Sequence, residues 1–234
     1  MDGTRSPLAR PSAEARIGNY RVAITPDCAP KRQCARAPQV PASGGRERWS
    51  VTVVAATLPI PDPPLGDSLI SLRPPEERDL SAIERGVHDP DVIRAFGRPT
   101  MSAEQLLDLN RSRWDRGEAA TFAICDASGR CVGHVFVNLS GKDRGSVGYW
   151  LLPEARGKGL ASRAVKLVSR WALRDLALAR LALLTEPSNR QSLRVAEITG
   201  FQEEGVLRSY TEIDGRRVDY VSFSLLPSDL YRDV

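Results

Sequence analysis

The stretch between residues 145 and 175 constrains the fold more than any other part of the chain. An apolar run, GSVGYWLL, ends at Pro153, and the glycine-rich basic sequence ARGKG follows at once. Apolar residues then recur at intervals of three and four, which predicts an amphipathic helix over 157–175 with one face on a sheet. The chain must therefore contain a strand, a short glycine-rich turn and a docked helix in direct succession. The apolar face of this helix comprises Leu160, Ala164, Leu167, Val168, Trp171 and Ala172.

The glycine-rich turn has the properties of an anion-binding site. The first N–H groups of a helix lack intrahelical partners and lie at the positive end of the helix dipole. Gly157 and Gly159 carry no Cβ atom to keep a phosphate from the main chain, and Arg156 and Lys158 add positive charge. The alternative is a plain turn with two solvated charges. The turn is not a P-loop, which needs Ser or Thr after its lysine, and it lacks the third glycine of the G-x-G-x-x-G fingerprint.

From Ser68 onward, regular elements follow one another closely. Two of the predicted strands, 121–125 and 131–139, form a hairpin around DASGR, and two others close as a hairpin around Asp214 and Gly215. The order of elements predicts an α+β fold with a mixed, mostly antiparallel sheet flanked by helices. The other predicted strands are 68–74, 145–152, 179–185, 201–213 and 216–226, and the other helices begin after Asp79 and span 103–117 and 187–200.

Residues 1–66 have a different character and hold ten of the seventeen prolines. They show no sustained apolar period, so we expect a disordered Pro/Arg-rich N-terminal extension ahead of a domain over 67–234, with 58–66 as an extended lead-in. An alternative is that translation begins near Val51. Residues 1–50 carry a net charge of +5 and the remainder −1, so nucleic-acid binding by the folded part is disfavoured. Docking of the basic tail on ribosomes or nucleic acid stays open.

Cysteine spacing and hydropathy exclude two further classes. Cys28, Cys34, Cys125 and Cys131 lack the spacing of a zinc site, so we expect no metal and reduced thiols, the last two facing each other across the predicted hairpin. No stretch approaches the roughly 18 apolar residues of a membrane span, and the N-terminus has no signal-peptide layout. We therefore expect a cytoplasmic protein that does not bind membranes.

Two motifs carry a family resemblance. GYWLLPEARGKGLA followed by EPSNRQSLRVAEITGF resembles the GCN5-related N-acetyltransferases (GNAT), especially the RimJ/RimL-type branch. Residues 156–161 match the family's R/Q-x-x-G-x-G/A acyl-CoA motif, and Asn189, Ser192, Gly200 and Phe201 match its N-x-x-S…GF element. Asp219 fits the usual ending of the branch. The resemblance covers roughly residues 68–226.

The resemblance implies transfer of an acetyl group from acetyl-CoA to a primary amine, without a metal. It implies splayed parallel strands at the acyl-CoA site, with the pantetheine arm between them and the pyrophosphate on the N–H groups of 157–161. A main-chain N–H within Trp150–Leu152 would polarise the thioester carbonyl. The residues expected to bind the cofactor are Trp150, Leu151, Leu152, Arg156, Gly157, Lys158, Gly159, Leu160, Ala161 and Asn189.

The catalytic groups follow the family pattern only in part. Ser192 matches the position that hydrogen-bonds and protonates the departing thiolate. Many relatives carry a glutamate base where this chain has Ser146, and others a tyrosine acid where it has Ala196. His134, on the neighbouring strand, is our candidate for the missing base, with a structural histidine as the alternative.

Plain structural roles remain open for several of these residues. Asn189 could simply cap its helix, and Ser192 could be an ordinary serine of a first helical turn. Glu154 and Glu186 lie beside the motifs, with surface charges as their simplest interpretation. Tyr149 and Trp150 alternate on a strand, so one is expected in the core and the other in the acceptor cleft.

A weak base favours a weakly basic acceptor. A lysine amine, with a pKa near 10.4, loses roughly 4–5 kcal/mol on becoming neutral at pH 7, and an α-amine about 1 kcal/mol. We therefore expect a protein N-terminal α-amine as the acceptor. The alternatives are a small-molecule amine such as an antibiotic, or a non-catalytic acyl-CoA-binding module. Relatives occur as monomers and homodimers, and the sequence selects neither.

Overall fold

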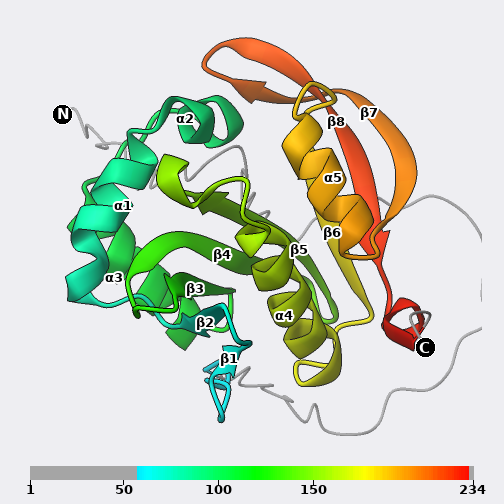
Figure 1. Cartoon of the computed structure of the whole chain (residues 1–234). Helices are drawn as coiled ribbons and strands as arrows, with labels where there is room; N and C mark the ends of the chain where they lie inside the picture. The colour runs from blue at the N-terminus through cyan, green and yellow to red at the C-terminus, as the bar shows by residue number, and fades with distance from the viewer. Residues whose placement is uncertain (1–56, 232–234) are drawn as a thin grey trace, which may run out of the picture.

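The structure, a computed structural model, describes residues 57–231 (Figure 1). Within this part of the chain, eight strands form one sheet in the order β1-β2-β3-β4-β5-β6-β8-β7, and all neighbours are antiparallel except β5 and β6. The predicted mixed, mostly antiparallel sheet is confirmed. The strands are β1 (Leu65–Gly66), β2 (Ile70–Arg73), β3 (Ala119–Asp126), β4 (Cys131–Ser140), β5 (Arg144–Leu151), β6 (Arg180–Thr185), β7 (Gln202–Ile213) and β8 (Arg216–Leu225).

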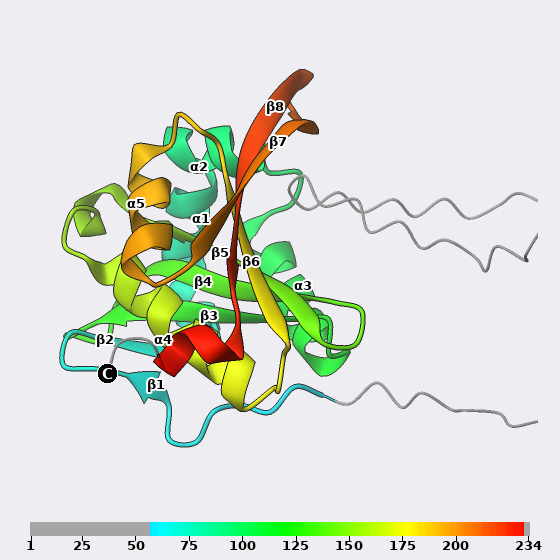
Figure 2. The same ribbon diagram turned by 90° about the vertical axis from the view of Figure 1, so that its right-hand side faces the viewer.

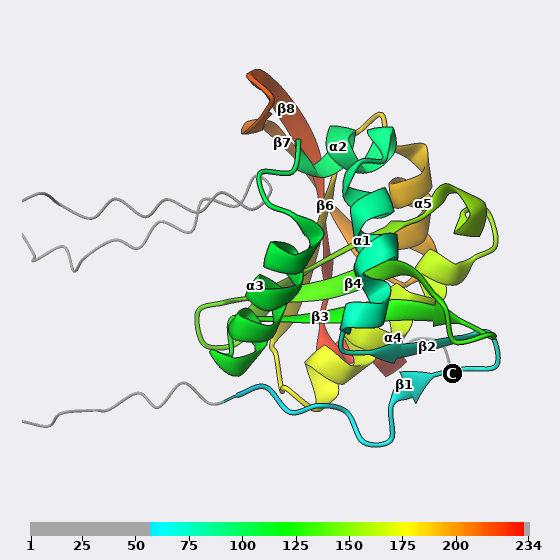
Figure 3. The same ribbon diagram turned by 90° about the vertical axis from the view of Figure 1, so that its left-hand side faces the viewer.

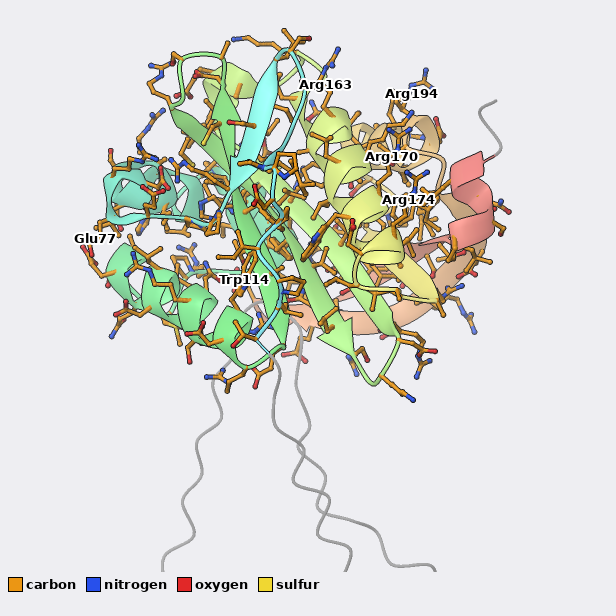
Figure 4. The ribbon with its side chains drawn as sticks, turned by 90° about the horizontal axis from the view of Figure 1, so that it is seen from below. Glu77, Trp114, Arg163, Arg170, Arg174 and Arg194 are labelled. Atoms are coloured by element: carbon orange, nitrogen blue, oxygen red, sulfur yellow. The ribbon has the colours of Figure 1, made fainter. Side chains whose placement is uncertain are left out.

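Helices cover both faces of the sheet, as the view from below shows (Figure 4). α1 and α3 pack on β4 and β3 from one side, which we call the α1 side, and α4 and α5 pack on β4, β5 and β6 from the other, the α4 side. α2 lies near β7, where the far end of the β7–β8 hairpin projects (Figures 2 and 3). No helix between residues 57 and 231 is both long and apolar enough to cross a membrane. The helices are α1 (Leu80–Val87), α2 (Pro90–Phe96), α3 (Ala103–Asp115), α4 (Leu160–Arg174) and α5 (Arg190–Ile198), with 3-10 turns at Glu77–Asp79, Pro153–Ala155 and Pro227–Tyr231.

The parallel pair β5 and β6 separates partway along its length. Pairing runs only from Arg144 opposite Arg180 to Ser146 opposite Ala182. β5 nevertheless continues to Leu151 and β6 to Thr185, each still paired with its other neighbour. The main-chain groups that face each other beyond Ser146 therefore lack the ladder partners that a continuous sheet would supply. The sheet has a gap at this point.

Packing against the sheet fixes the direction of α4. Its buried face contains the predicted apolar stripe, with Leu167 only partly buried, and it also includes Val165, Ser169 and Leu173. Trp171 of α4 lies 5.3 Å from Phe122 of β3 and 6.3 Å from Trp114 of α3, measured between ring centroids. Burial of each such aromatic side chain stabilises the fold by roughly 2–3 kcal/mol. The first turn of α4 is thereby held beside the end of β5.

The folded domain begins earlier than the sequence predicts. Trp114 Nε1 donates to the carbonyl of Leu58 at 2.8 Å, and Leu58 N–H donates to the carbonyl of Trp114 at 3.3 Å. β1 pairs with β2. Residues 57–66, expected above to end the N-terminal extension with 58–66 as an extended lead-in, thus contact the domain, because their backbone groups and Leu58 find partners in it. The expectations for residues 1–56, including the basic tail, its two cysteines and the alternative start, lie outside the described residues.

One helix, α2, was not predicted. Its N-cap Asp89 accepts hydrogen bonds from the N–H groups of Asp91 and Val92, at 3.0 and 3.2 Å, and Pro90 occupies the first helical position. Asp followed by Pro is a helix-start signal, but α2 is only seven residues long. Such a short element shows too little periodicity to be recognised from apolar spacing.

The two cysteines of the β3–β4 hairpin lie opposite each other, as predicted. Cys125 and Cys131 are paired in register and both are free thiols. Burial raises the pKa of Cys131 to about 12, although a hydrogen bond from the backbone of Gly133 acts in the opposite direction. The thiol therefore stays protonated at neutral pH.

Candidate functional site

A cavity of about 710 Å³ occupies the gap between β5 and β6. Its wall also includes residues of α2, β4, the first turns of α4 and α5, and the β7–β8 hairpin. Among the predicted site residues, Leu152, Lys158 and His134 do not line it. Those that do are Trp150, Leu151, Arg156, Gly157, Gly159, Leu160, Ala161, Asn189 and Ser192.

The glycine-rich turn forms an open cradle at the α4 side of this cavity. Gly157 and Gly159 have φ of 74° and 75°, in the left-handed region that favours glycine, and a Cβ on either would meet no atom within 4 Å. The first main-chain hydrogen bond of α4 runs from Arg163 N–H to Gly159 O at 3.2 Å. The N–H groups of 160–162 precede it, so they are the donors that a helix N-terminus offers to an anion. Lys158 is exposed beside the turn.

Arg156 holds the turn in place through charge pairs. Its Nη2 donates to Asp89 Oδ1 at 2.5 Å, its Nη1 to Asp91 Oδ2 at 2.8 Å, and its Nε to the carbonyl of Leu151 at 3.0 Å. Burial tends to raise the pKa of Asp89, but the Arg156 guanidinium and the Val92 N–H outweigh it, and the pKa is lowered. Arg156 therefore joins the turn to the start of α2, and two carboxylates share its charge.

The main chain of β5 presents its polar groups to the gap at alternate residues. Leu152 N–H donates to Val132 O at 2.9 Å, so this group, one of the N–H donors expected for a thioester, is already used. In an antiparallel ladder, residues alternate between facing their partner strand and facing away from it. Because Leu152 faces β4, the main-chain groups of Tyr149 and Leu151 face the gap.

Asn189 and Ser192 lie together at the start of α5. Asn189 is the N-cap, and its Oδ1 accepts a hydrogen bond from Ser192 N–H at 3.1 Å. The helix-capping role left open for Asn189 is thus present, and the residue also lines the cavity. The Ser192 hydroxyl is hydrogen-bonded to the phenol of Tyr149. Burial raises the pKa of Tyr149 and the bond to Ser192 opposes this rise, so the pair is a protonated hydroxyl chain at neutral pH.

The α1 side of the cavity is aromatic. Trp150 fits beneath α1, where a Cβ on Gly86 would lie only 2.3 Å from its indole. A Cβ on Gly148 would lie 2.5 Å from the ring of Phe136, which contacts Phe96 of α2 edge-on at 5.9 Å. Both glycines are therefore required by close ring packing. Tyr149 and Trp150 both line the cavity, one toward each side, so it passes through the sheet.

His134 lies away from the cavity. It is 3% exposed, and its ring centroid lies 4.8 Å from that of Trp150, with the two rings tilted by 37°. Burial lowers its pKa to about 4, although the nearby carboxylate of Asp79 acts to raise it, and its Nε2 has no hydrogen-bond partner among the described residues. His134 thus contacts Trp150 but does not itself line the cavity, and we do not assign it a proton-transfer role.

Several cavity residues escaped the sequence analysis. No local sequence pattern could have identified them, because the α2 residues and the β7–β8 residues are about a hundred positions apart in the chain and meet only in the fold. Glu186 was noted as a surface charge, yet it lines the cavity directly after the last residue of β6. The additional lining residues include Asp91, Arg94, Phe96, Phe136, Glu186, Tyr210 and Tyr220.

Comparison with known proteins places this site in a family. The sequence matches the Acetyltransferase (GNAT) domain family over residues 70–202. Uncharacterized N-acetyltransferase p20 of Bacillus licheniformis is 30% identical over 164 residues, covering 67% of this chain and 92% of that protein. Spermidine N(1)-acetyltransferase of Escherichia coli K12 is 29% identical over 150 residues, covering 63% of this chain and 80% of that protein. The structure of Mycobacterium smegmatis RimJ in complex with CoA-disulfide has a TM-score of 0.63 and 23% identity, covering 72% of this chain and 88% of that one.

The matched region contains the gap between β5 and β6, the glycine cradle and the Asn189–Ser192 turn. The RimJ likeness concerns the fold, and it agrees with the mixed sheet described above. The family match and the p20 relative together cover most of the described residues. The chain therefore belongs to the GNAT acetyltransferase family and is an N-acetyltransferase.

Proposed function

We propose that this enzyme transfers the acetyl group of acetyl-CoA to the α-amine of a protein N-terminus. One observation carries the proposal: the cavity passes through the sheet at the gap between β5 and β6, with a phosphate cradle on the α4 side and an aromatic chamber on the α1 side. A donor and an acceptor can therefore enter from opposite faces and meet in the gap, which brings the reacting groups together without a covalent enzyme intermediate.

The residues on the α4 side fit acetyl-CoA. The N–H groups at the start of α4 and the open space at Gly157 and Gly159 suit its pyrophosphate, and Lys158 adds an exposed positive charge. The main-chain groups of Tyr149 and Leu151 face the gap, where they can bind an extended pantetheine arm as a strand would. A main-chain N–H in the same row is suitably placed to polarise the thioester carbonyl. Acetyl-CoA supplies the activated acyl group.

A hydroxyl pair is available to the leaving group. Ser192 lines the cavity and is hydrogen-bonded to Tyr149. Rotation of the two hydroxyl groups would let Ser192 donate its proton toward the departing sulfur while Tyr149 donates to Ser192. Tyr149 thus takes the place of the family's tyrosine acid, whose position in this chain is Ala196, a buried residue of α5.

The α-amine is favoured over a polyamine by the charges of the cavity. Its described lining contains four arginines, Arg94, Arg156, Arg190 and Arg194, against two carboxylates, Asp91 and Glu186. A polyamine carries several positive charges and needs several carboxylates, whereas an α-amine is singly charged and about half neutral near pH 8. Among the relatives, one is named for spermidine and a structural neighbour is RimJ, so both acceptor classes belong in the test.

The test is thiol release by the full chain in the presence of acetyl-CoA. The acceptors are peptides with a free N-terminus and no lysine, the same peptides N-terminally blocked and carrying one lysine, spermidine, and an aminoglycoside. We expect the free-N-terminus peptides to give the highest kcat/KM at pH 7. Faster acetylation of the blocked lysine peptides, of spermidine or of the aminoglycoside would show that the acceptor assignment is wrong. Absence of thiol release with every amine would refute catalysis.

Replacing Ser192 tests the leaving-group role. We expect Ser192→Ala to lower kcat by about 10- to 100-fold, since general-acid assistance contributes at least this much, and to leave the Kd for acetyl-CoA within about threefold. Ser192→Thr keeps a hydroxyl and should retain most of the activity. Because Ser192 N–H, not its side chain, bonds the Asn189 cap, neither variant disturbs the start of α5. If Ser192→Ala and Ser192→Thr have equal rates, Ser192 does not protonate the leaving group.

A further inference from the structure

The cavity has two carboxylates in its described lining, and they differ in their partners. Asp91 accepts from Arg156 at 2.8 Å and lies 3.5 Å from Arg94. Glu186 pairs with Arg216, whose Nη2 lies 3.6 Å from its Oε2, longer than a good hydrogen bond. The carboxylate of Glu186 therefore keeps acceptor capacity toward the cavity that Asp91 has already used.

Burial also distinguishes Glu186 from an ordinary surface acid. Its side chain is 11% exposed, whereas Arg216, at the start of β8, is 61% exposed. Glu154, the other acid beside the motifs, is 52% exposed and paired with Arg85 at 2.7 Å. A carboxylate withdrawn from water interacts more strongly with a cation than one at the surface. Glu186 is thus positioned to bind a positive charge inside the cavity.

The position of Glu186 in the sheet directs it to the acceptor side. Leu181 and Leu183 of β6 pack in the core with α4, so alternation along the strand turns Leu184 toward the α1 side, and Glu186 is the next even position, one residue beyond the end of β6. Both line the cavity. On that side they share the chamber with Phe136 and Trp150, opposite the cradle that fits the cofactor.

The chamber also has an aromatic wall. Phe96 and Phe136 pack edge to face, and Tyr210 and Tyr220 lie 5.9 Å apart between ring centroids. These side chains offer area for an apolar group and no further negative charge. An acceptor that fills such a chamber gains by burying apolar surface, at about 25 cal/mol per Å².

Resting on the acetyltransferase function proposed above, we propose that Glu186 binds the acceptor's ammonium group and takes its proton, and that the acceptor is a singly charged primary amine carried on an apolar or aromatic group. Glu186 removes one proton from the ammonium, and the neutral nitrogen attacks the thioester carbonyl carbon. The C–N bond forms and the C–S bond breaks. The second proton leaves the nitrogen for solvent, and the sulfur gains one from Ser192, which is reprotonated from solvent through Tyr149. The products are an amide and a free thiol.

The experiment compares three variants of the full chain: Glu186→Gln, Glu186→Asp and the matched control Glu154→Gln. We expect Glu186→Gln to lower kcat/KM for the amine by about 100-fold or more, the usual effect of losing a general base. The Kd for acetyl-CoA, measured by calorimetry, should stay within about twofold. Glu186→Asp should restore part of the rate, because it keeps a carboxylate. Glu154→Gln should match wild type.

The acceptor class is tested with peptides that differ only in their first residue. Peptides beginning with Phe or Leu should exceed those beginning with Asp or Lys by about tenfold, a normal range for discrimination by an apolar pocket, and 2-phenylethylamine should outperform spermidine. If wild type transfers acetyl groups but Glu186→Gln is within threefold of it, the role of Glu186 is overturned while the proposed function stands. A preference for Asp-first or Lys-first peptides or for spermidine overturns the acceptor class. An inactive wild type overturns both proposals.

Discussion

Gly159→Glu is expected to abolish tight acetyl-CoA binding. The new side chain would stand at the open end of α4, where the N–H groups of 160–162 point, and its carboxylate would meet the pyrophosphate. Like charges about 4 Å apart repel by roughly 4 kcal/mol at an effective dielectric constant of 20. We therefore expect a fall in affinity of at least about 100-fold, equivalent to about 2.7 kcal/mol. Calorimetric titration of the full chain with acetyl-CoA measures it directly.

The β3–β4 hairpin supplies a matched control for the backbone strain in this variant. Gly129 has φ of 81° and, like Gly159, would have no atom within 4 Å of a Cβ. Gly129→Glu therefore introduces the same left-handed strain and the same charge away from the cradle. It should lose similar stability and keep the wild-type affinity. Equal affinity in Gly159→Glu and Gly129→Glu would mean that the glycine-rich turn is only a turn.

Asp79→Ala is expected to destabilise the protein by about 3 kcal/mol, because it removes the nearest carboxylate from the largely buried charge of Arg73. Asp79 is 2% exposed, and it accepts from Arg73 Nη1 and Nη2 at 2.7 and 2.8 Å and from Glu76 N–H at 2.8 Å. It therefore joins β2 to the start of α1. Urea unfolding of the full chain, followed by tryptophan fluorescence, measures the loss.

The lowered pKa of the Asp79 carboxyl predicts that the stability of the fold depends on pH. Burial acts to raise the pKa of Asp79, but the hydrogen bonds from Arg73 and Glu76 N–H outweigh it, and the pKa is lowered from 3.8. A carboxyl whose pKa is lower when folded stabilises the protein above its unfolded pKa, and this stability is lost as pH falls through the folded pKa. The difference in free energy of unfolding between wild type and Asp79→Ala should therefore have its full value at pH 6 and become smaller below pH 3.8. The exposed acid Glu154 is the control: Glu154→Ala should change stability little at either pH. A pH-independent difference would mean that lost packing, not charge, is responsible.

Local signals in the sequence were sufficient where neighbouring residues determine the structure. The helix beginning after Ser102 follows its capping box, with Gln105 N–H bonded to the Ser102 hydroxyl at 3.3 Å. The turn before α4 needs glycine at left-handed φ, and Gly157 and Gly159 in the sequence indicate such a turn. Each feature depends on residues within a few positions of one another, so propensity and spacing carry the information.

The roles of charged and polar residues were less predictable. Arg156 was read as a charge for the phosphate, yet its guanidinium is held by Asp89 and Asp91, more than sixty positions earlier in the chain. The sequence suggests His134 as a base, whereas the structure places its ring 4.8 Å from Trp150 and outside the cavity lining. A pattern of residue types shows which chemistry is available, but it does not show which partner is nearest.

The sequence by itself determined the order of strands and helices, the glycine cradle and the family, because these depend on residues close together in the chain. Only the tertiary structure decided the acceptor side of the cavity. The gap between β5 and β6 depends on where two strands stop pairing, and the aromatic chamber depends on α2 meeting the β7–β8 hairpin. Side-chain burial and partner choice, as at Glu186 and Arg156, are properties of the packed molecule, since they follow from long-range contacts that no local pattern encodes.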